Sequence, residues 1–517
     1  MKLSKLFFLL SITLVVFSCS NNDDKNGGDE NPVEINFQHL TTINAGGTTE
    51  ITAFDPLTNK IFVVNPDDKN ILVYNLTNVT TPVEGSSIDV SSVGSPNSVA
   101  VSNGKLAVAV EAPVKQNSGS VLVYDTDSQS LQNTYTVGAL PDMLTFTPDG
   151  TKIIVANEGE PNSLYNNDPK GTVSIIELST NNVTNLDFDS FNSQTAALAQ
   201  SGFRVFGPNA DLSEDVEPEY VAVSDDSKTA WVSLQENNGI ARVNLGTKNI
   251  EEIYPLGFKN YNLAGNEIDP SDKDDLTELN TWPVYGMYQP DALEYVNING
   301  TGYVISANEG DAREYIDDKG TDDEEDDEEV YVEEIRVKDV DLDPVNFPAG
   351  EDYGASEKLG RLKITTTLGN TDADVEFEEL YSFGARSFSI WSATGSLVYD
   401  SGNEIAERTL SLTPASFNAD DGEADGRSDD KGAEPETVEA LIIGNKTILF
   451  VGLERNSQVL VYDISNPAAP EFIQILQQPG DEAPEGVLAI AESDSPSGKA
   501  LLIVTNEDSG TISIYQN

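Results

Sequence analysis

The sequence PETVEALIIGNKTILFVGLERNSQVLVYDI, residues 435–464, contains three short apolar runs that are separated by turn-forming residues. It opens with Pro435-Glu436, its second run ends at Glu454, and its third run has the pattern V-x-V-Y-D. Short runs rich in Val, Ile and aromatic residues between turns are typical of β-strands. The segment therefore predicts three consecutive antiparallel strands, with one acidic residue where the first strand starts and another where the second strand ends.

The same order of features recurs along the chain. A proline followed by an acidic or amide residue opens a run at Pro96-Asn97, Pro141-Asp142, Pro218-Glu219, Pro290-Asp291, Pro435-Glu436 and Pro484-Glu485. A second run then ends in glutamate, at Glu111, Glu158, Glu236, Glu309, Glu454 and Glu507. An earlier unit, residues 50–76, keeps the three runs but has Asn65 in place of the glutamate. A weaker fourth run often follows, so the repeat has four strands in roughly 45–50 residues, as in the blades of β-propellers.

We predict an all-β fold with a single β-propeller of seven four-stranded blades, similar to YVTN and WD repeats. The last repeat stops after its third strand, and a strand at Val33–Leu40 precedes the first repeat. We expect these two strands to share one blade and close the ring, which hides the strand edges. The runs SFSIWS and SLVYDSG, within residues 387–402, are either an eighth blade or an inserted hairpin, and we favour the hairpin. The third strand of the unit that begins at Pro290 is then RLKITT, residues 361–366.

Four insertions interrupt the repeat. Residues 184–214 and 259–288 lengthen two connections. Residues 317–329 form a run of charges without core-forming residues, which predicts a solvated loop. Residues 420–434 form a second acidic insertion, directly before Pro435-Glu436.

The second acidic insertion contains Asp421-x-Glu423-x-Asp425-Gly426, which matches the first half of a calcium-binding loop. The match ends at Gly432, where an EF-hand has glutamate. The remaining ligands would have to come from Asp429, Asp430 or Glu434. A calcium site and a plain acidic loop are both open interpretations of this segment.

Residues 1–18 are predicted to be a signal peptide, because a short positive start precedes an apolar run, Leu6–Phe17, that is too short to span a bilayer. The run is followed by Cys19, the only cysteine of the chain, in a sequence that resembles the lipobox of bacterial lipoproteins. We therefore predict lipidation of Cys19, and the alternative is an ordinary signal peptide beside an incidental cysteine. Residues 19–32 would be a disordered tether. Residues 33–517 would be the propeller domain, held at the outer membrane on the cell surface or on the periplasmic side.

The chain has 88 acidic and 29 basic residues, a formal net charge of −59, which excludes nucleic acid and anionic lipid surfaces as partners. We expect a monomer that contacts the membrane through its lipid anchor only. The single histidine, His39, and the single cysteine exclude Ser-His-Asp and Cys-His catalysis and the usual zinc sites. No nucleotide-phosphate loop is present in the sequence. An enzyme built on this chain would have to use carboxylates, hydroxyls and hard cations.

The acids at the strand ends are the most informative feature. In a propeller blade the first strand lines the axis and the second runs antiparallel beside it, so both sets of acids are expected at one mouth of the central channel. Carboxylates this close stay ionised only if countered, for example by Arg313 and Arg455 or by metal ions. The candidate metal ligands, with calcium as the candidate ion, are Glu158, Glu219, Glu309, Asp421, Glu423, Asp425, Glu436, Glu454, Glu485 and Glu507. The alternative is structural, with each carboxylate bonded to backbone N–H groups of an adjoining loop.

Several longer strings carry a family resemblance. They are ANEGEPN (156–162), DVEPEYVAVS (215–224), YQPDALEYV (288–296), ANEGDAREY (307–315), GARSFSIW (384–391) and RSDDKGAEPE (427–436). These strings resemble the choice-of-anchor I family, and the resemblance covers nearly the whole mature chain. It implies an exported β-propeller whose attachment device differs between members, the lipobox being the device here. Members carry labels such as mesenchyme-specific cell-surface glycoprotein or alkaline phosphatase.

Two functions follow as hypotheses. The first is a non-catalytic surface module that binds an unknown protein, glycan or cationic ligand. The second is a calcium-dependent phosphohydrolase of the alkaline phosphatase kind, in which clustered ions would bind phosphate and activate water. The negative charge of the chain opposes the second hypothesis, because it repels an anionic substrate unless ions bind first.

Overall fold

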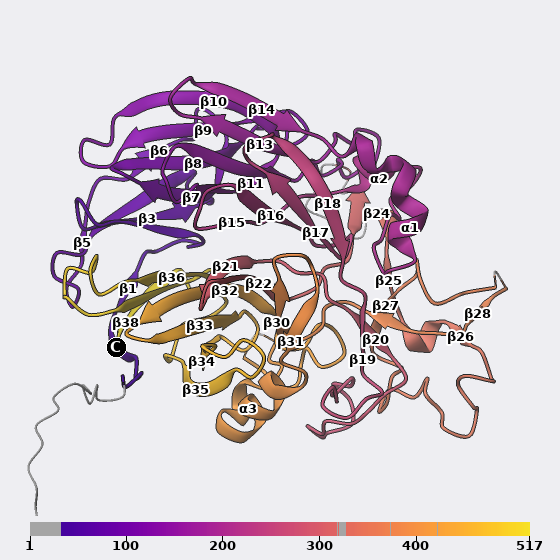
Figure 1. The fold of residues 1–517 in the computed structure, drawn as a ribbon. Coiled ribbons are helices and arrows are strands. Elements are labelled where there is room, and N and C mark those ends of the chain that lie inside the picture. The colour runs from indigo at the N-terminus through magenta and orange to yellow at the C-terminus, as the bar shows by residue number, and fades with distance from the viewer. Residues whose placement is uncertain (1–32, 318, 320–326, 373, 421) are drawn as a thin grey trace, which may run out of the picture. The chain divides into compact units, whose positions relative to one another are not determined.

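The computed structural model describes residues 33–517, with the exception of 318, 320–326, 373 and 421 (Figure 1). The predicted signal peptide, the lipidation site Cys19 and the predicted tether lie outside the described residues. Compactness separates residues 1–34 from residues 35–517, and the fold below is that of the second unit. Strands dominate it, which confirms the all-β class, and its described α-helices are α1 (Thr195–Ala199), α2 (Leu212–Asp215) and α3 (Glu404–Leu412). None of the described helices is long and apolar enough to cross a membrane.

Seven antiparallel sheets of four or five strands account for most of the described strands. In chain order, the first three are β2 (Thr52–Asp55), β3 (Lys60–Asn65), β4 (Asn70–Asn75), β5 (Val83–Glu84) and β6 (Ile88–Asp89); β7 (Ser95–Ser102), β8 (Lys105–Glu111), β9 (Ser118–Asp125) and β10 (Leu131–Ala139); and β11 (Pro141–Phe146), β12 (Lys152–Asn157), β13 (Thr172–Glu177) and β14 (Asn182–Leu186). The next three are β15 (Val221–Val223), β16 (Thr229–Leu234), β17 (Gly239–Asn244) and β18 (Asn249–Pro255); β21 (Leu293–Ile298), β22 (Thr301–Asn308), β30 (Ser387–Ser392) and β31 (Leu397–Asp400); and β32 (Pro435–Ile443), β33 (Lys446–Leu453), β34 (Gln458–Asp463) and β35 (Glu471–Leu476). The last sheet joins both chain ends, with β1 (Gln38–Asn44), β36 (Pro484–Ile490), β37 (Leu501–Asn506) and β38 (Thr511–Gln516).

These sheets are arranged as the blades of a β-propeller. Their first strands contact one another in chain order, from β2 through β7, β11, β15, β21 and β32 to β36, and β36 contacts β2. In Figure 1 the early sheets, in indigo and magenta, lie opposite the late sheets, in orange and yellow. The terminal strands β1 and β38 pair antiparallel, with Gln38 beside Gln516 and Asn44 beside Thr511. The N-terminal strand thus adds a fourth strand to the last repeat, as predicted, but it begins at Gln38 and not at Val33.

Hydrophobic cores fill the spaces between neighbouring sheets. In β3, Ile61 and Val63 pack toward the sheet that joins the chain ends, whereas Phe62 and Val64 pack toward the β7–β10 sheet. Because successive side chains of a strand point to opposite faces, a strand between two cores is apolar at every position. This explains why second strands such as KIFVV and KLAVAV are continuously hydrophobic. Acidic residues are therefore confined to the ends of these strands.

The runs SFSIWS and SLVYD form neither an eighth blade nor an inserted hairpin. They are β30, which pairs with β22, and β31, which pairs with β30, and they complete the blade that begins with β21. The predicted third strand, residues 361–366, instead contributes β27 (Lys363–Thr365) to a small sheet with β25 (Glu334–Arg336). The insertion is therefore residues 309–386, between the second and third strands of this blade. The prediction was wrong because RLKITT has strand composition and comes earlier in the chain than the true third strand.

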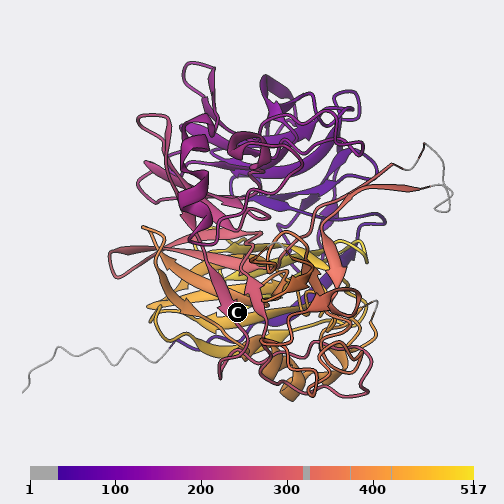
Figure 2. The same cartoon turned by 90° about the vertical axis from the view of Figure 1, so that its right-hand side faces the viewer.

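Further short strands lie outside the seven sheets. Besides β25 and β27, they are β19 (Phe258–Asn260), β20 (Tyr285–Met287) and β29 (Tyr381–Ser382) in one sheet, β23 (Glu314–Asp317) with β24 (Glu328–Val332), and β26 (Asp341–Leu342) with β28 (Glu376–Phe377). A separate apolar cluster around Tyr261, Leu359 and Leu362 supports this region. Figure 2 shows β23 and β24, in salmon, extending beyond the blades. The insertion is thus a folded addition to this blade.

Candidate functional site

The residues that follow the recurring prolines stand in β-bulges. The pairing of the first two strands shifts register in four blades, between Pro96 and Ser98, Pro141 and Leu144, Pro435 and Val438, and Pro484 and Gly486. A β-bulge inserts an extra residue, bends the strand and re-aims a side chain. The amide or acid after each of these prolines lies inside the bulge. The bulge therefore explains why the Pro-acid pair recurs where an inner strand begins.

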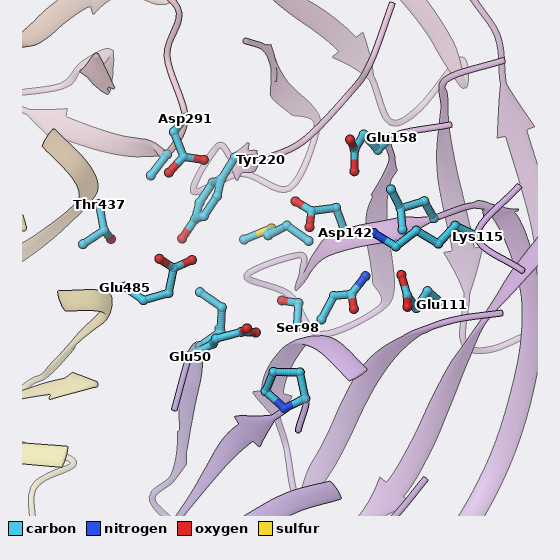
Figure 3. A pocket seen from close by; sticks show the side chains of 16 residues that line it. Glu50, Ser98, Glu111, Lys115, Asp142, Glu158, Tyr220, Asp291, Thr437 and Glu485 are labelled. Atoms are coloured by element: carbon cyan, nitrogen blue, oxygen red, sulfur yellow. The ribbon is translucent and has the colours of Figure 1, made fainter. Parts of the chain in front are cut away.

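Carboxyl groups from several blades line a cavity of about 290 Å³ at this mouth (Figure 3). The acidic residues that line it are Glu50, Glu111, Asp142, Glu158, Asp291 and Glu485. All of these acids except Glu50 were expected at the mouth from their positions in the repeat. Glu50 precedes the run ITAF as Glu485 precedes GVLAI, but Thr49 replaces the proline, so the Pro-acid signal is absent. Its position in the repeat was the signal that would have found it.

The carboxyls of this cavity have few cationic partners. Burial and the charge of Asp291 raise the pKa of Asp142 to about 7. Burial and the charge of Glu507, which follows β37, raise the pKa of Glu50 to about 8. Burial also raises the pKa of Glu158 well above its usual range. These groups therefore hold protons close to neutral pH unless a cation takes the place of the protons.

Glu219 and Glu236 extend this acidic region into the protein. Their side chains are nearly buried, at 8% and 5% exposure, and the Oε2 atom of each has no hydrogen-bond partner among the described residues. Burial and the charges of Glu236 and Glu158 raise the pKa of Glu219 well above its usual range. A buried acceptor without a partner costs free energy. This part of the mouth thus has more acceptor oxygens than the folded chain satisfies.

Three of the predicted ligands approach one another closely. Glu309 after β22, Glu436 in β32 and Glu454 after β33 each offer an oxygen within 4.8 Å of the other two. This spacing permits all three oxygens to contact one ion at roughly 2.4 Å, a distance typical of calcium. Burial raises the pKa of Glu454 to about 7. Burial and the charges of Glu309 and Asp291 raise the pKa of Glu436 well above its usual range, and the carboxyls of Asp291 and Glu436 share a hydrogen bond.

Cations of the chain compensate one side of this group. The Lys431 Nζ contacts Oε1 of Glu309 and lies 3.2 Å from Oε2 of Glu434. Arg427 and Arg455 also pair with Glu434, with Nη2 of Arg427 at 2.6 Å and Nε of Arg455 at 3.4 Å. Burial alone would raise the pKa of Glu434, but these three cations together lower it to about 2. Glu434 is thus a permanently charged anchor for the segment that carries Lys431.

The predicted calcium ligands of residues 420–434 serve mainly in ion pairs. Oδ2 of Asp429 lies 2.8 Å from Nη2 of Arg361, and Oδ2 of Asp430 lies 3.0 Å from Nζ of Lys363. With Glu434 paired to Lys431, each residue that was expected to complete the loop already holds a cation of the chain. These pairs attach the segment to the inserted region that contains β27.

The first half of the predicted loop does not supply a ligand set among the described residues. Asp421 lies outside them, and Glu423 is exposed to solvent. Asp425 accepts a hydrogen bond from the Ser428 hydroxyl at 2.6 Å. Burial raises the pKa of Asp425 to about 6, and the charge of Asp274 contributes. Neither Asp425 nor Asp274 lines the cavity at the channel mouth. Because Asp421 lies outside the described residues, the calcium-loop match stays a prediction.

The two arginines expected to counter the strand-end acids differ. Nη2 of Arg455 lies 3.1 Å from Oε1 of Glu454, as predicted. Arg313 instead pairs with Asp215, Nη1 to Oδ1 at 2.9 Å, and with Glu217, Nη2 to Oε2 at 3.1 Å, and all three side chains are buried. Asp215 and Glu217 were not predicted from the sequence. Their signal was the acidic DVE directly before Pro218.

The mouth offers oxygen ligands. His39 lies in β1, where its Nε2 and the Thr42 hydroxyl are 2.8 Å apart, and it does not line the cavity. Figure 3 shows the Tyr220 hydroxyl pointing toward Glu485, while the Lys115 side chain reaches toward Asp142 from the opposite side. Carboxylate oxygens select hard cations such as Ca²⁺ over ions that prefer thiolate or imidazole. The arrangement is suited to collecting and holding cations.

Two curated relatives cover parts of the chain. The chain is 30% identical over 182 residues to Gigasin-3a of Magallana gigas, a match that covers 30% of this chain and 64% of that protein. It is 27% identical over 291 residues to the mesenchyme-specific cell surface glycoprotein of Strongylocentrotus purpuratus, covering 50% of this chain and 36% of that protein. The chain thus spans less than two thirds of the length of either relative.

A solved propeller and a family model cover most of the chain. The β-propeller domain of Cps50 (Swd1) from Myceliophteria thermophila aligns with 93% of this chain and 100% of its own, at 8% identity and a TM-score of 0.45. The family model of the choice-of-anchor I domain matches residues 50–467, which is more than half of the chain. The match includes the six inner strands from β2 to β32 and the carboxylates Glu309, Glu436 and Glu454. The chain therefore belongs to the choice-of-anchor I family.

Proposed function

We propose that this protein is a cell-surface module whose β-propeller binds a hard divalent cation of the calcium class at the mouth of its channel. The observation that carries the proposal is the approach of Glu309, Glu436 and Glu454 to within 4.8 Å of one another. The name of the family refers to anchoring, and the name of one relative refers to the cell surface, which supports an exported and surface-held protein.

The charge distribution favours a bound cation. A net charge of −59 raises the local concentration of cations around the whole molecule. At the mouth, a divalent ion would replace the protons of carboxyls whose pKa is raised, and it would relieve the repulsion between them. Lys431 contacts Glu309 and Arg455 contacts Glu454, but each carboxylate has about four lone-pair sites. The group therefore keeps acceptor capacity for an ion.

Calcium should stabilise the purified protein. A ligand that binds only the folded state adds ~2.7 kcal/mol to the free energy of unfolding at a hundredfold excess over its Kd. Thermal unfolding would be measured at pH 8 with calcium and with chelator, at one ionic strength so that general screening cancels. Glu436→Gln keeps the shape of the side chain but removes a ligand charge, so it should abolish the calcium effect. Glu84→Gln, an exposed change in β5, is the matched control and should keep the effect.

Equal unfolding midpoints in calcium and in chelator for the unmodified protein would contradict the proposal. The same samples separate the module from a phosphohydrolase when p-nitrophenyl phosphate is added. Calcium-dependent turnover that Glu436→Gln abolishes would favour the phosphohydrolase. A calcium effect on stability without turnover would favour the binding module.

The proposal includes a lipid anchor at Cys19. The support is the position of the only cysteine directly after a signal-like apolar run. Cys19→Ser should release the processed protein from membranes or stop its processing, and cell fractionation with immunoblotting measures both. A processed Cys19→Ser protein that still sediments with membranes would contradict the anchor.

A further inference from the structure

We infer that the cavity beside Asp142 binds a primary ammonium group on an alkyl chain, the chemistry shared by a lysine side chain of a protein partner and a free alkylamine. This site is distinct from the proposed divalent-cation site, because Glu309, Glu436 and Glu454 do not line the cavity. The inference goes beyond the proposed function and can stand or fall without it.

The size and the walls of the cavity suit such a group. Its volume of about 290 Å³ exceeds the volume of one ion and admits a short alkyl chain. Ile51, Leu140 and Met143 line it together with the acidic residues. Apolar walls bury methylene groups, as they do along the side chains of lysines that keep their ammonium at a polar boundary. The cavity thus offers one surface for the chain and another for the charge.

The spacing of the cavity carboxyls favours an ammonium group over a metal ion as the ligand. In the described part of the chain, the groups of three or more acids close enough to share one metal ion do not include a residue that lines this cavity. An ammonium group has three donors and makes hydrogen bonds of roughly 2.8 Å, so it can join acceptors that lie farther apart than the ligands of a metal ion. The cavity carboxyls therefore fit an ammonium group better than a bare ion.

Carboxyl groups at the cavity are free to accept hydrogen bonds from an ammonium group. No hydrogen bond or ion pair within the described residues engages the carboxyls of Asp142 or Glu485. The nearby Glu219 is 8% exposed, and its Oε2 has no hydrogen-bond partner in the described structure. Tyr220 also lines the cavity, and an aromatic ring beside an ammonium group adds a favourable cation–π interaction. These groups come from three different blades, so a ligand would join the blades across the channel.

Two lysines of the chain, Lys431 and Lys115, show how acidic residues at the mouth hold an ammonium group. Where inserted cations compensate the acids, the Lys431 side chain is 13% exposed and its ammonium is held by Glu309 and Glu434. At the cavity, Lys115 is the lining cation, its side chain is 54% exposed, and its closest carboxylate oxygen is that of Glu160 at 3.8 Å. Lys115 is therefore loosely held and stands where an incoming ammonium group would bind. Its removal should open the site by eliminating a tethered competitor.

The test uses small probes on the full mature protein. Binding of n-butylamine, Nα-acetyl-lysine methylamide and the neutral Nα-acetyl-norleucine methylamide would be measured by isothermal titration and ligand-observed NMR at pH 8.5. We expect both amines to bind and the neutral probe not to bind. Asp142→Asn should weaken amine binding by about tenfold or more, the value of one charge-assisted hydrogen bond, and Lys115→Met should strengthen it severalfold. Tighter binding of the acetyl-lysine probe than of n-butylamine indicates a lysine of a protein, and the reverse order indicates a free amine.

A crossed pair of variants keeps this inference separate from the divalent-cation proposal. Glu454→Gln should weaken the calcium effect and leave amine binding unchanged, whereas Asp142→Asn should weaken amine binding and leave a calcium effect in place. Binding of the neutral probe equal to that of the amines would overturn the inference, as would amine binding unaffected by Asp142→Asn. A calcium effect without amine binding overturns the inference alone, and amine binding without a calcium effect overturns the divalent-cation proposal alone.

Discussion

Two carboxyl groups at the same channel mouth have pKa values that are shifted in opposite directions. Glu434 has no solvent-exposed side-chain surface, yet the cations around it lower its pKa to about 2. Asp142 lines the cavity a few blades away, and burial with the charge of Asp291 raises its pKa to about 7. Lys115, the cation that lines this cavity, is half exposed. Both groups stand beside the start of an inner strand, so their position in the blade does not explain the difference in pKa. The cationic partners of the two groups explain it.

The comparison separates what the repeat supplies from what the insertions supply. Each repeat brings acids to the mouth, since the bulge after the proline and the end of the second strand recur from blade to blade. The insertion 420–434 brings Arg427 and Lys431 to one side only, and the insertion 309–386 brings Arg313 to a buried acidic pair. The part of the mouth without an inserted cation is left with unpaired acids. We expect an external cation to bind in the part of the mouth without inserted cations and where this part adjoins the part that has them.

Glu434→Gln removes the carboxylate that Lys431, Arg427 and Arg455 surround, and it should have the largest effect on the free energy of unfolding. The amide cannot neutralise Lys431, Arg427 or Arg455, so each of these partly buried cations would lose one of its carboxylate partners. Removing one member of a buried ion pair costs about 3–5 kcal/mol. We expect a loss of about 3 kcal/mol in the free energy of unfolding at pH 7, measured by urea denaturation, with the exposed change Glu84→Gln as control.

The pH dependence of the same variant gives a second check. The folded-state pKa of Glu434 lies below its ordinary value of 4.5, so its stabilising contribution is present above about pH 4.5 and is lost as the pH falls toward 2. The difference between the unmodified protein and Glu434→Gln should therefore shrink only below pH 4.5. A variant as stable as the unmodified protein at pH 7 would show that the cations do not depend on Glu434.

The repeat made most of the fold predictable from the sequence. Each Pro-acid pair and each run that ends in glutamate marks a strand boundary, because those residues stand where the strands leave the apolar cores. The exception was the third strand of the β21 blade. RLKITT and SFSIWS have equal strand composition, and only the packing of Phe388 and Ile390 against the core shared with β33 and β34 decides between them. Local sequence carries no information about which of two strands finds that core.

The candidate site was predictable in part. The convergence of Glu309, Glu436 and Glu454 follows from the geometry of a blade, and these three were predicted from their positions in the repeat. Glu50 was missed because its proline is absent, and the pairing of Arg313 was wrong because the inserted segment directs it to Asp215. Pairings between an insertion and a distant blade depend on tertiary contacts, which have no periodic signal in the sequence.

Asp142→Asn tests the uncompensated side and should give a smaller effect of opposite sign. Because the folded-state pKa of Asp142, about 7, lies above its ordinary value of 3.8, the folded protein binds more protons between these pH values. Its stabilising contribution is therefore present below about pH 4 and is lost as the pH rises through 7. Asparagine does not titrate, so the variant should gain stability relative to the unmodified protein as the pH rises from 5 to 8.

One pKa unit corresponds to about 1.4 kcal/mol, but Asp142 lines a cavity that is open to solvent, so we expect a relative gain of only about 1 kcal/mol over this range. Urea denaturation in chelator, with both proteins at pH 5, 6, 7 and 8, measures the difference. Parallel stability curves would mean that Asp142 carries its charge in the folded state without cost, and the two sides of the mouth would then not differ. If calcium or n-butylamine reduces the relative stability gain of Asp142→Asn, then binding of a cation lowers the cost of the Asp142 charge in the folded protein.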